Sequence, residues 1–231
     1  MSLKYGPRIV SNGLVSYYDP SNSECYTAGS NIVYDLVDNS RSGSLYSGVD
    51  YSSISKGAFE FDGSANALIE VPPLENIEDF TISIWFRVIG SGDVGSSLYS
   101  TLIGNLFGGD NRLLVHNTLP NRPITVDFAT PDGITLVNST SSFDEWNNAV
   151  FTYNNTTGTG SAYVNNILSP TSIEDSNISF DNNIHWLGGS SNPISNYSMK
   201  GYISNCLIYN RELSLNEVDK NYNALKTKFS L

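Results

Sequence analysis

Acidic residues that alternate along one short segment are the first feature of this sequence that could do chemistry. Glu60 and Asp62 flank Phe61, so an extended chain places both carboxylates on one face. Two carboxyl groups beside a glycosidic bond can hydrolyse it, one as acid and the other as nucleophile or base. The next residues, 63–65, are Gly-Ser-Ala, and no third acid extends the run. We therefore expect no catalysis, and keep a polysaccharide hydrolase or lyase as an alternative.

The two histidines and two cysteines give no sign of a reactive centre. His116 and His185 have no His, Cys or Asp neighbours at zinc-binding spacing. The sequence also has no Gly-x-Ser-x-Gly nucleophile motif and no phosphate-binding loop. These observations favour a protein that is not an enzyme and requires no cofactor.

Period-two alternation predicts which side chains of the strands would face outward. If Phe80 and Phe86 point into a core, Trp85 and Arg87 point away from it. The same alternation turns three further side chains outward: His116, Asp127 and Trp186. Aromatic rings stack on sugars, and Asp, Arg and His hydrogen-bond to hydroxyl groups, so these five residues would form a glycan platform if their strands share one sheet. The competing interpretation is that Trp85 packs under loops for structural reasons, which makes Trp186 the strongest candidate.

The elements that would position these residues are short strands separated by turn signals, a pattern typical of a sandwich or barrel. The turn signals include Pro131-Asp-Gly133 and Asn165-Asn166. Strands are expected at residues 14–18, 58–62, 68–71, 80–88, 100–104, 112–117, 123–130, 134–138, 146–153, 160–164, 184–188 and 201–209. The strand at 80–88 alternates without a break and is expected to be half-buried.

One helix is expected near the C-terminus, over residues 214–226. Ser214 and Glu217 have the spacing of a capping box, in which each side chain bonds to the backbone of the other residue. A stripe at helical spacing would dock on the sandwich. It consists of Leu215, Val218, Tyr222 and Leu225.

Charge and hydropathy limit the partners and the compartment. The net charge of −11 disfavours nucleic acids and anionic membranes. No stretch reaches the ~20 apolar residues of a membrane span, and the first residues lack the apolar core of a secretion signal. We expect synthesis in a cytoplasm and two free thiols at Cys25 and Cys206.

An ordered set of motifs, each weak alone, covers the chain from about residue 13 to residue 222. It comprises Phe61-Asp-Gly63, Phe80–Trp85, Trp146–Val150, Tyr163-Val-Asn165, Leu187-Gly-Gly189, Gly201–Asn205 and Ile208–Ser214. In order and spacing the set resembles the laminin G-like branch of the concanavalin A-like lectin/glucanase superfamily. The resemblance implies an all-β, two-sheet antiparallel jelly-roll sandwich, here a single domain of residues 1–231 with an N-terminal arm at 1–12. The family's turn after the Tyr163 strand reads Asn-Gly, whereas this chain has Asn-Asn.

The resemblance also bears on metals and on the tryptophans. Laminin G-like modules often hold a calcium ion with Asp side chains and loop carbonyls, which makes Asp19, Asp62 and Asp132 candidate ligands. The resemblance further implies that Asp62 belongs to a structural Phe-Asp-Gly turn. Trp85 and Trp146 stand at motif positions of the family.

The two ends of the chain, residues 1–15 and 221–229, are similar to virion-associated proteins of tailed bacteriophages, especially marine ones. This similarity implies a protein that is made in the host cytoplasm, released by lysis and located in the virion. We expect a virion surface, decoration or attachment protein that binds cell-surface glycans or other virion proteins. A purely structural virion subunit without a ligand is the alternative, and homo-oligomerisation is left open.

Overall fold

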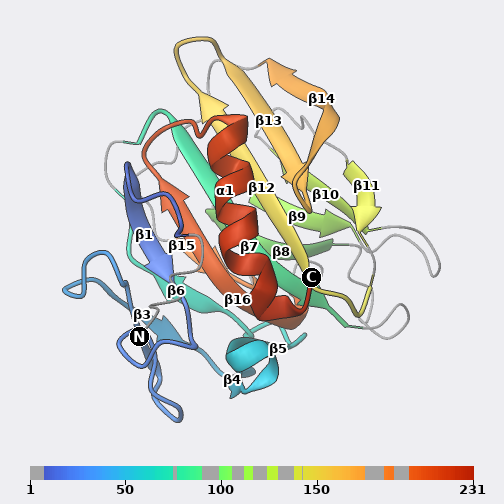
Figure 1. Cartoon of the computed structure of the whole chain (residues 1–231). Helices are drawn as coiled ribbons and strands as arrows, with labels where there is room; N and C mark the ends of the chain where they lie inside the picture. Colours follow the sequence, from blue (N-terminus) through green and yellow to red (C-terminus); the bar gives the residue numbers. More distant parts are fainter. Residues whose placement is uncertain are drawn as a thin grey trace, which may run out of the picture.

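The computed structural model describes residues 8–74, 77–89, 99–105, 112–116, 124–129, 138–141, 143–174, 185–189 and 198–231. These residues form two antiparallel eight-stranded sheets, called sheet A and sheet B (Figure 1). Sheet A has the order β14-β13-β12-β7-β16-β5-β4, with β1 paired to β16; sheet B has the order β11-β10-β9-β8-β15-β6-β3-β2. The all-β sandwich with a C-terminal helix is therefore confirmed.

The strands of sheet A are β1 (Leu14–Tyr18), β4 (Val49–Ser52), β5 (Ala58–Asp62), β7 (Phe80–Val88), β12 (Asn147–Asn154), β13 (Thr159–Val164), β14 (Ile167–Glu174) and β16 (Lys200–Tyr209). Those of sheet B are β2 (Ile32–Tyr34), β3 (Ser42–Leu45), β6 (Ile69–Val71), β8 (Tyr99–Asn105), β9 (Arg112–His116), β10 (Ile124–Ala129), β11 (Asn138–Ser141) and β15 (His185–Leu187). The helices are η1 (Ile54–Lys56), α1 (Leu215–Leu225) and η2 (Lys226–Phe229).

The main core fills the space between the two sheets. Alternate residues of β7, from Phe80 to Val88, are fully buried there. They meet apolar residues of sheet B such as Leu113, Val115 and Leu187, each 0% exposed. The inward row predicted from Phe80 to Phe86 is confirmed, because the period-two side chains of facing sheets share one interior.

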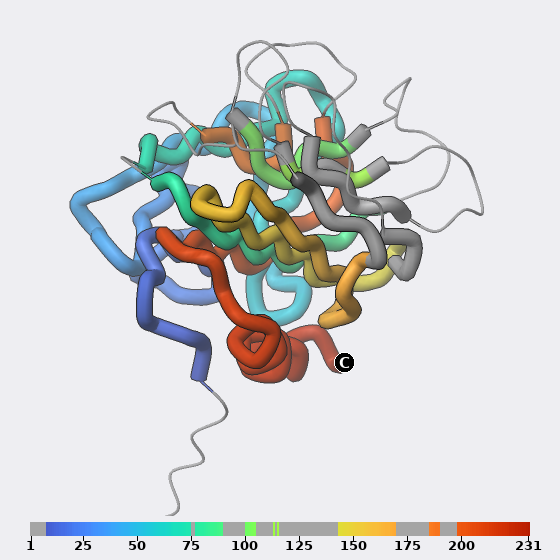
Figure 2. Tube along the Cα trace, turned by 90° about the horizontal axis from the view of Figure 1, so that it is seen from above, coloured from blue at the N-terminus to red at the C-terminus, as the bar shows by residue number. Residues whose placement is uncertain are grey.

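The outer face of sheet A is also covered, by the C-terminal helix, whose docking on the sandwich was predicted without the face that it would cover. Helix α1 crosses this face over β12, β7 and β16, on the side away from sheet B (Figures 1 and 2). Val218 of the helix and Val10 of the N-terminal arm belong to a second apolar cluster that includes Leu207 and Tyr209 of β16. Strand β7 is consequently buried on both faces rather than half-buried.

Helix α1 begins at the predicted capping box. The Glu217 carboxylate accepts hydrogen bonds from the backbone N–H and the hydroxyl of Ser214, both at 3.0 Å. The predicted docking stripe is partly wrong, because Leu215 is 55% exposed. The buried position is taken instead by Asn221, whose amide joins the backbone N–H of Val10 to the Tyr209 hydroxyl.

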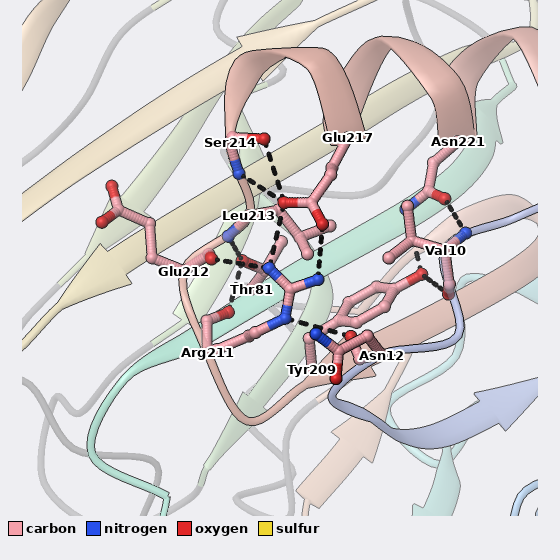
Figure 3. Close-up of polar contacts among 10 residues, drawn as sticks. All are labelled: Val10, Asn12, Thr81, Tyr209, Arg211, Glu212, Leu213, Ser214, Glu217 and Asn221. Atoms are coloured by element: carbon pink, nitrogen blue, oxygen red, sulfur yellow. Dashed lines mark hydrogen bonds and ion pairs between the residues drawn. The ribbon is translucent and has the colours of Figure 1, made fainter.

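Arg211, which directly follows β16, forms hydrogen bonds with both the N-terminal arm and helix α1 (Figure 3). Its guanidinium donates to both carboxylate oxygens of Glu217, at 2.6 and 3.0 Å, and to the backbone carbonyl of Asn12 at 3.0 Å. Gly13 lies against this side chain with a φ of +77°, where a Cβ would come within 2.9 Å of Arg211 Nε. Both ends of the described chain are thus held on the same outer face.

Other expectations have mixed outcomes. The Asn165-Asn166 turn is confirmed, with φ values of 50° and 67°. Cys25 and Cys206 are free, as expected, and both are also buried. The strands β2, β3, β4 and β14 were not predicted, while residues 131–137, which include the Pro131-Asp-Gly133 turn and most of the strand expected at 134–138, lie outside the described residues. Among the described segments, no helix is long and apolar enough to cross a membrane.

Candidate functional site

A row of directly opposed residues crosses the outer face of sheet B from one strand to the next. Residues opposite each other in antiparallel strands share a face, so the register defines the row. It runs through Ile32, Ser44, Glu70, Trp186 and Gly104. Ile32 and Ser44 are exposed, and Glu70 and Trp186 are half-buried. This face therefore presents an indole ring and a carboxylate side by side to solvent.

Trp186, Tyr46 and Glu70 form a contiguous group, called here the Trp186 patch. The rings of Trp186 and Tyr46 meet edge to face, with centroids 5.8 Å apart and an interplanar angle of 63°. The Tyr46 hydroxyl donates a 2.7 Å hydrogen bond to Glu70 Oε2, and this bond raises the pKa of the hydroxyl. On the other side of Trp186, the opposed residue Gly104 adds no side chain next to the indole.

The chemistry of the Trp186 patch suits a polyhydroxylated ligand. An exposed indole face packs against the apolar face of a sugar ring, and Tyr46 restrains its orientation. A carboxylate accepts hydrogen bonds from hydroxyl groups, and Glu70 is already oriented by Tyr46. Rigid aromatic groups on strands lose little conformational entropy when a ligand binds.

The predicted glycan platform is divided between the two sheets. Strand β7, with Trp85 and Arg87, belongs to sheet A, whereas β15, with Trp186, belongs to sheet B. The outer faces of the two sheets point in opposite directions, so these side chains cannot contact one ligand. The assumption that all five residues share one sheet is wrong, because strand alternation carries no information about sheet membership.

Trp85 is also covered on its own face. It is 0% exposed and stacks on Phe229 of η2 and on Tyr222 of α1. Trp146 packs against the same Phe229 ring. The expectation that Trp85 faces solvent is therefore wrong, and the competing structural interpretation holds, with the C-terminal helix as the cover instead of loops.

Arg87 is half-buried on the outer face of sheet A, opposite Tyr202 of β16. Tyr202 in turn faces Glu60 of β5 and donates a 3.2 Å hydrogen bond to its carboxylate. Asp62, the second acid of the predicted pair, accepts a 2.7 Å hydrogen bond from the backbone N–H of Ser64. This polar row lies on the face opposite the Trp186 patch.

His116 and Asp127 lie on β9 and β10 of sheet B, two neighbouring strands separated from β15 by β8. Their side chains are outside the part of the chain that the structure describes. Of the five predicted residues, Trp186 is thus the one with a described side chain on sheet B. Two members of its patch were missed: Glu70 follows the alternation of the predicted strand 68–71 and could have been found, whereas Tyr46 follows a Ser/Gly-rich stretch with no strand signal.

The candidate calcium ligands do not form a cluster in the described residues. Asp19 forms an ion pair with Lys228 Nζ at 2.8 Å, so the Lys228 ammonium group occupies the position that a calcium ion would need. The Asp62 carboxylate accepts a hydrogen bond from the backbone N–H of Ser64 in its own turn. Asp132 lies outside the described residues. Within the described ranges, no group of three His, Cys, Asp or Glu side chains is placed to hold a metal ion.

Two antiparallel sheets packed face to face, with one helix on the outer side, define a concanavalin A-like sandwich. The sequence profile of the concanavalin A-like lectin/glucanases superfamily matches residues 61–219. The chain belongs to this superfamily. A search of curated proteins finds no significant match.

Several solved structures have a similar fold at low sequence identity. The binding domain of botulinum neurotoxin serotype D is 17% identical, with a TM-score of 0.67 over 91% of this chain and 51% of that one. The receptor binding domain of botulinum neurotoxin type G is 19% identical, with a TM-score of 0.64 over 92% and 51%. The Trypanosoma rangeli sialidase in complex with sialic acid is 15% identical, with a TM-score of 0.70 over 95% and 34%. The chain thus spans about half of the neurotoxin chains and a third of the sialidase, and these likenesses concern the fold alone.

Proposed function

We propose that this protein is a non-enzymatic glycan-binding protein whose ligand docks on the outer face of sheet B at the Trp186 patch. The observation that carries the proposal is the solvent-facing indole of Trp186, restrained by Tyr46 and placed beside the Glu70 carboxylate. Among similar structures, one is a receptor binding domain and another is a sialidase that holds sialic acid. These likenesses concern the fold, and they agree with a binding role for this chain.

A glycan array with matched variants tests this proposal. Trp186→Ala is expected to weaken every hit at least tenfold, a loss of about 1.4 kcal/mol. Arg87→Gln is the control, because Arg87 lies on the opposite face. Binding that survives Trp186→Ala but is lost in Arg87→Gln would move the site to sheet A. An array without any hit would favour the alternative of a structural subunit without a ligand.

The absence of catalysis is part of the proposal. Glu60 and Asp62 are held by Tyr202 and Ser64, and neither acid lies on the face of the Trp186 patch. We expect no reducing sugar to be released from a panel of polysaccharides. Release that is abolished by Glu60→Gln would instead support the hydrolase or lyase alternative.

The proposed setting is the virion of a tailed bacteriophage, where the protein would contact other virion proteins and host glycans. The proposal rests on the similarity of the two chain ends to virion-associated proteins. The described residues of these ends pack together on the outer face of sheet A. That face is opposite the Trp186 patch, so attachment through it would leave the patch free. Mass spectrometry of purified virions is expected to detect the protein, and its restriction to the host cell fraction would contradict this setting.

A further inference from the structure

A hollow of about 620 Å³ opens at the β2 edge of sheet B. It is lined by Glu24 and by the consecutive residues from Tyr34 to Asn39. Tyr34 and Val37 contribute exposed apolar surface, at 41% and 45% exposure. A hollow with an exposed aromatic ring at its rim and polar groups in its wall has the makeup of a small ligand site.

The wall of the hollow is rigidly held by Asp35, which is fully buried. Its Oδ1 accepts hydrogen bonds from the backbone N–H groups of Tyr17 and Val37, both at 2.9 Å. Its Oδ2 forms an ion pair with Arg41 at 3.4 Å, so the buried charge is compensated. The loop from residue 35 to residue 39 is therefore fixed to β1 before any ligand arrives.

The charge of the hollow limits what it accepts. Glu24 and Asp38 present carboxylates at its surface. Hydrogen bonds from the Ser40 hydroxyl and backbone N–H hold the pKa of Asp38 below its usual value, so this group stays ionised at neutral pH. Carboxylates accept hydrogen bonds from hydroxyl and ammonium groups and repel anions. The chain's net charge of −11 acts in the same direction.

Tyr34, which lines the hollow, points to the same side of sheet B as the Trp186 patch. Tyr34 is two residues from Ile32 on β2, so both side chains point to the same side of sheet B. Ile32 begins the row that leads through Ser44 and Glu70 to Trp186. Three strand spacings separate β2 from β15, about 14 Å. A single sugar ring cannot bridge this distance, whereas an oligosaccharide can.

We infer that the hollow is a second subsite of the same binding face, and that the ligand is an oligosaccharide built from uncharged or amino sugars. One unit stacks on Trp186 and another sits against Tyr34 in the hollow. This inference rests on the proposed glycan-binding function and adds the length and the charge class of the ligand. Sugars that carry carboxylate or sulfate groups are excluded at the hollow by Glu24 and Asp38.

The test uses an array of cello-, xylo-, manno- and chito-oligosaccharides, from monosaccharide to hexasaccharide, beside alginate, hyaluronan and sialylated oligosaccharides. Affinity is expected to rise at least tenfold from disaccharide to hexasaccharide in one uncharged or amino series. Tyr34→Ala should remove most of this rise, since the longer oligosaccharides then lose their contact in the hollow. Leu168→Ala, an exposed residue of β14 in sheet A, is the matched control.

A charge reversal gives an independent measurement. Glu24→Lys should weaken binding of deacetylated chito-oligosaccharides at least threefold and improve binding of uronic acid oligosaccharides. Glu145→Lys, an exposed acid in the loop before β12, should change neither. This inference alone would be overturned if binding depends on Trp186 but its affinity changes neither with ligand length nor with Tyr34→Ala. Stronger binding of anionic oligosaccharides than of uncharged ones would overturn it as well. An array without hits would overturn the proposed function as well.

Discussion

Trp85 and Phe229 stack face to face on the outer side of sheet A, with ring centroids 4.2 Å apart and an interplanar angle of 15°. The contact joins the central strand β7 to the last turn of the chain, 144 residues later in the sequence. It converts a tryptophan that alternation turns outward into a core residue. The C-terminal segment is thus part of the packed structure of sheet A.

Phe229→Ala is expected to destabilise the protein by about 3 kcal/mol, because it leaves a cavity against Trp85 and Trp146. The emission of the uncovered indoles should shift to longer wavelength in the native protein. Urea unfolding followed by fluorescence measures both effects. Leu231→Ala, at an exposed position two residues later, is the control. Equal stability of the two variants would show that the stack contributes nothing.

The ion pair between Asp19 and Lys228 connects the loop after β1 to η2. Both side chains are mostly buried, so removing one partner leaves a poorly solvated charge. We expect Lys228→Met to cost about 2 kcal/mol, less than the 3–5 kcal/mol typical of fully buried pairs. The double variant Asp19→Asn/Lys228→Met should lose less than the sum of the single variants in a double-mutant cycle. Additive losses would mean that the two residues act independently.

Stability should depend on pH through Glu217. Hydrogen bonds from Arg211, opposed in part by desolvation, lower the pKa of this carboxyl to about 2. A depressed pKa in the folded state adds stability above the unfolded value of about 4.3, and this contribution is lost as the pH falls toward 2. The effect should be about 1 kcal/mol for a partly exposed pair. Urea midpoints at pH 6 and pH 3 are the measurement.

In that experiment the variant Glu217→Gln should lose less stability between pH 6 and pH 3 than the unmodified protein. Glu78→Gln, at an exposed position before β7, should behave like the unmodified protein. Identical pH dependence in all three proteins would exclude a role for the Arg211–Glu217 pair in acid stability.

The two thiols are expected to be inert in the folded protein. Cys25 and Cys206 are 0% and 1% exposed, and burial raises the pKa of both, to about 12 for Cys25. Because the thiolate is the reactive form, neither should react with Ellman's reagent until the chain unfolds. The reagent should then titrate both thiols in guanidinium chloride. Rapid labelling of the native protein would contradict the packing around these residues.

Calcium is expected to leave thermal stability unchanged. The Asp19 carboxylate is paired with Lys228, and Asp62 accepts a hydrogen bond from its own turn. An ion that binds the folded state raises the melting temperature by mass action, so thermal scans with calcium and with EDTA measure the effect. An increase of several degrees in calcium would identify a site that includes other ligands.

Local sequence patterns were sufficient for the elements that local interactions create. The unbroken alternation from Phe80 to Phe86 predicts a strand and the row that enters the core. The Ser214–Glu217 spacing predicts the start of α1, because the capping groups are one helical turn apart. Tight turns follow from the tolerance of Asn165 and Asn166 for positive φ.

The tertiary structure alone decided which strands share a sheet and which outward faces meet solvent. Alternation turns both Trp85 and Trp186 away from the core between the sheets. Trp85 is nevertheless buried beneath Phe229, whereas Trp186 faces outward beside Tyr46. Alternation assigns a side chain to one of two faces. Whether that face is covered depends on segments far away in the chain, such as the one that carries Phe229. The packing of such a segment on a strand is decided by the free energy of the whole fold, and it leaves no periodic signal in the sequence of that strand.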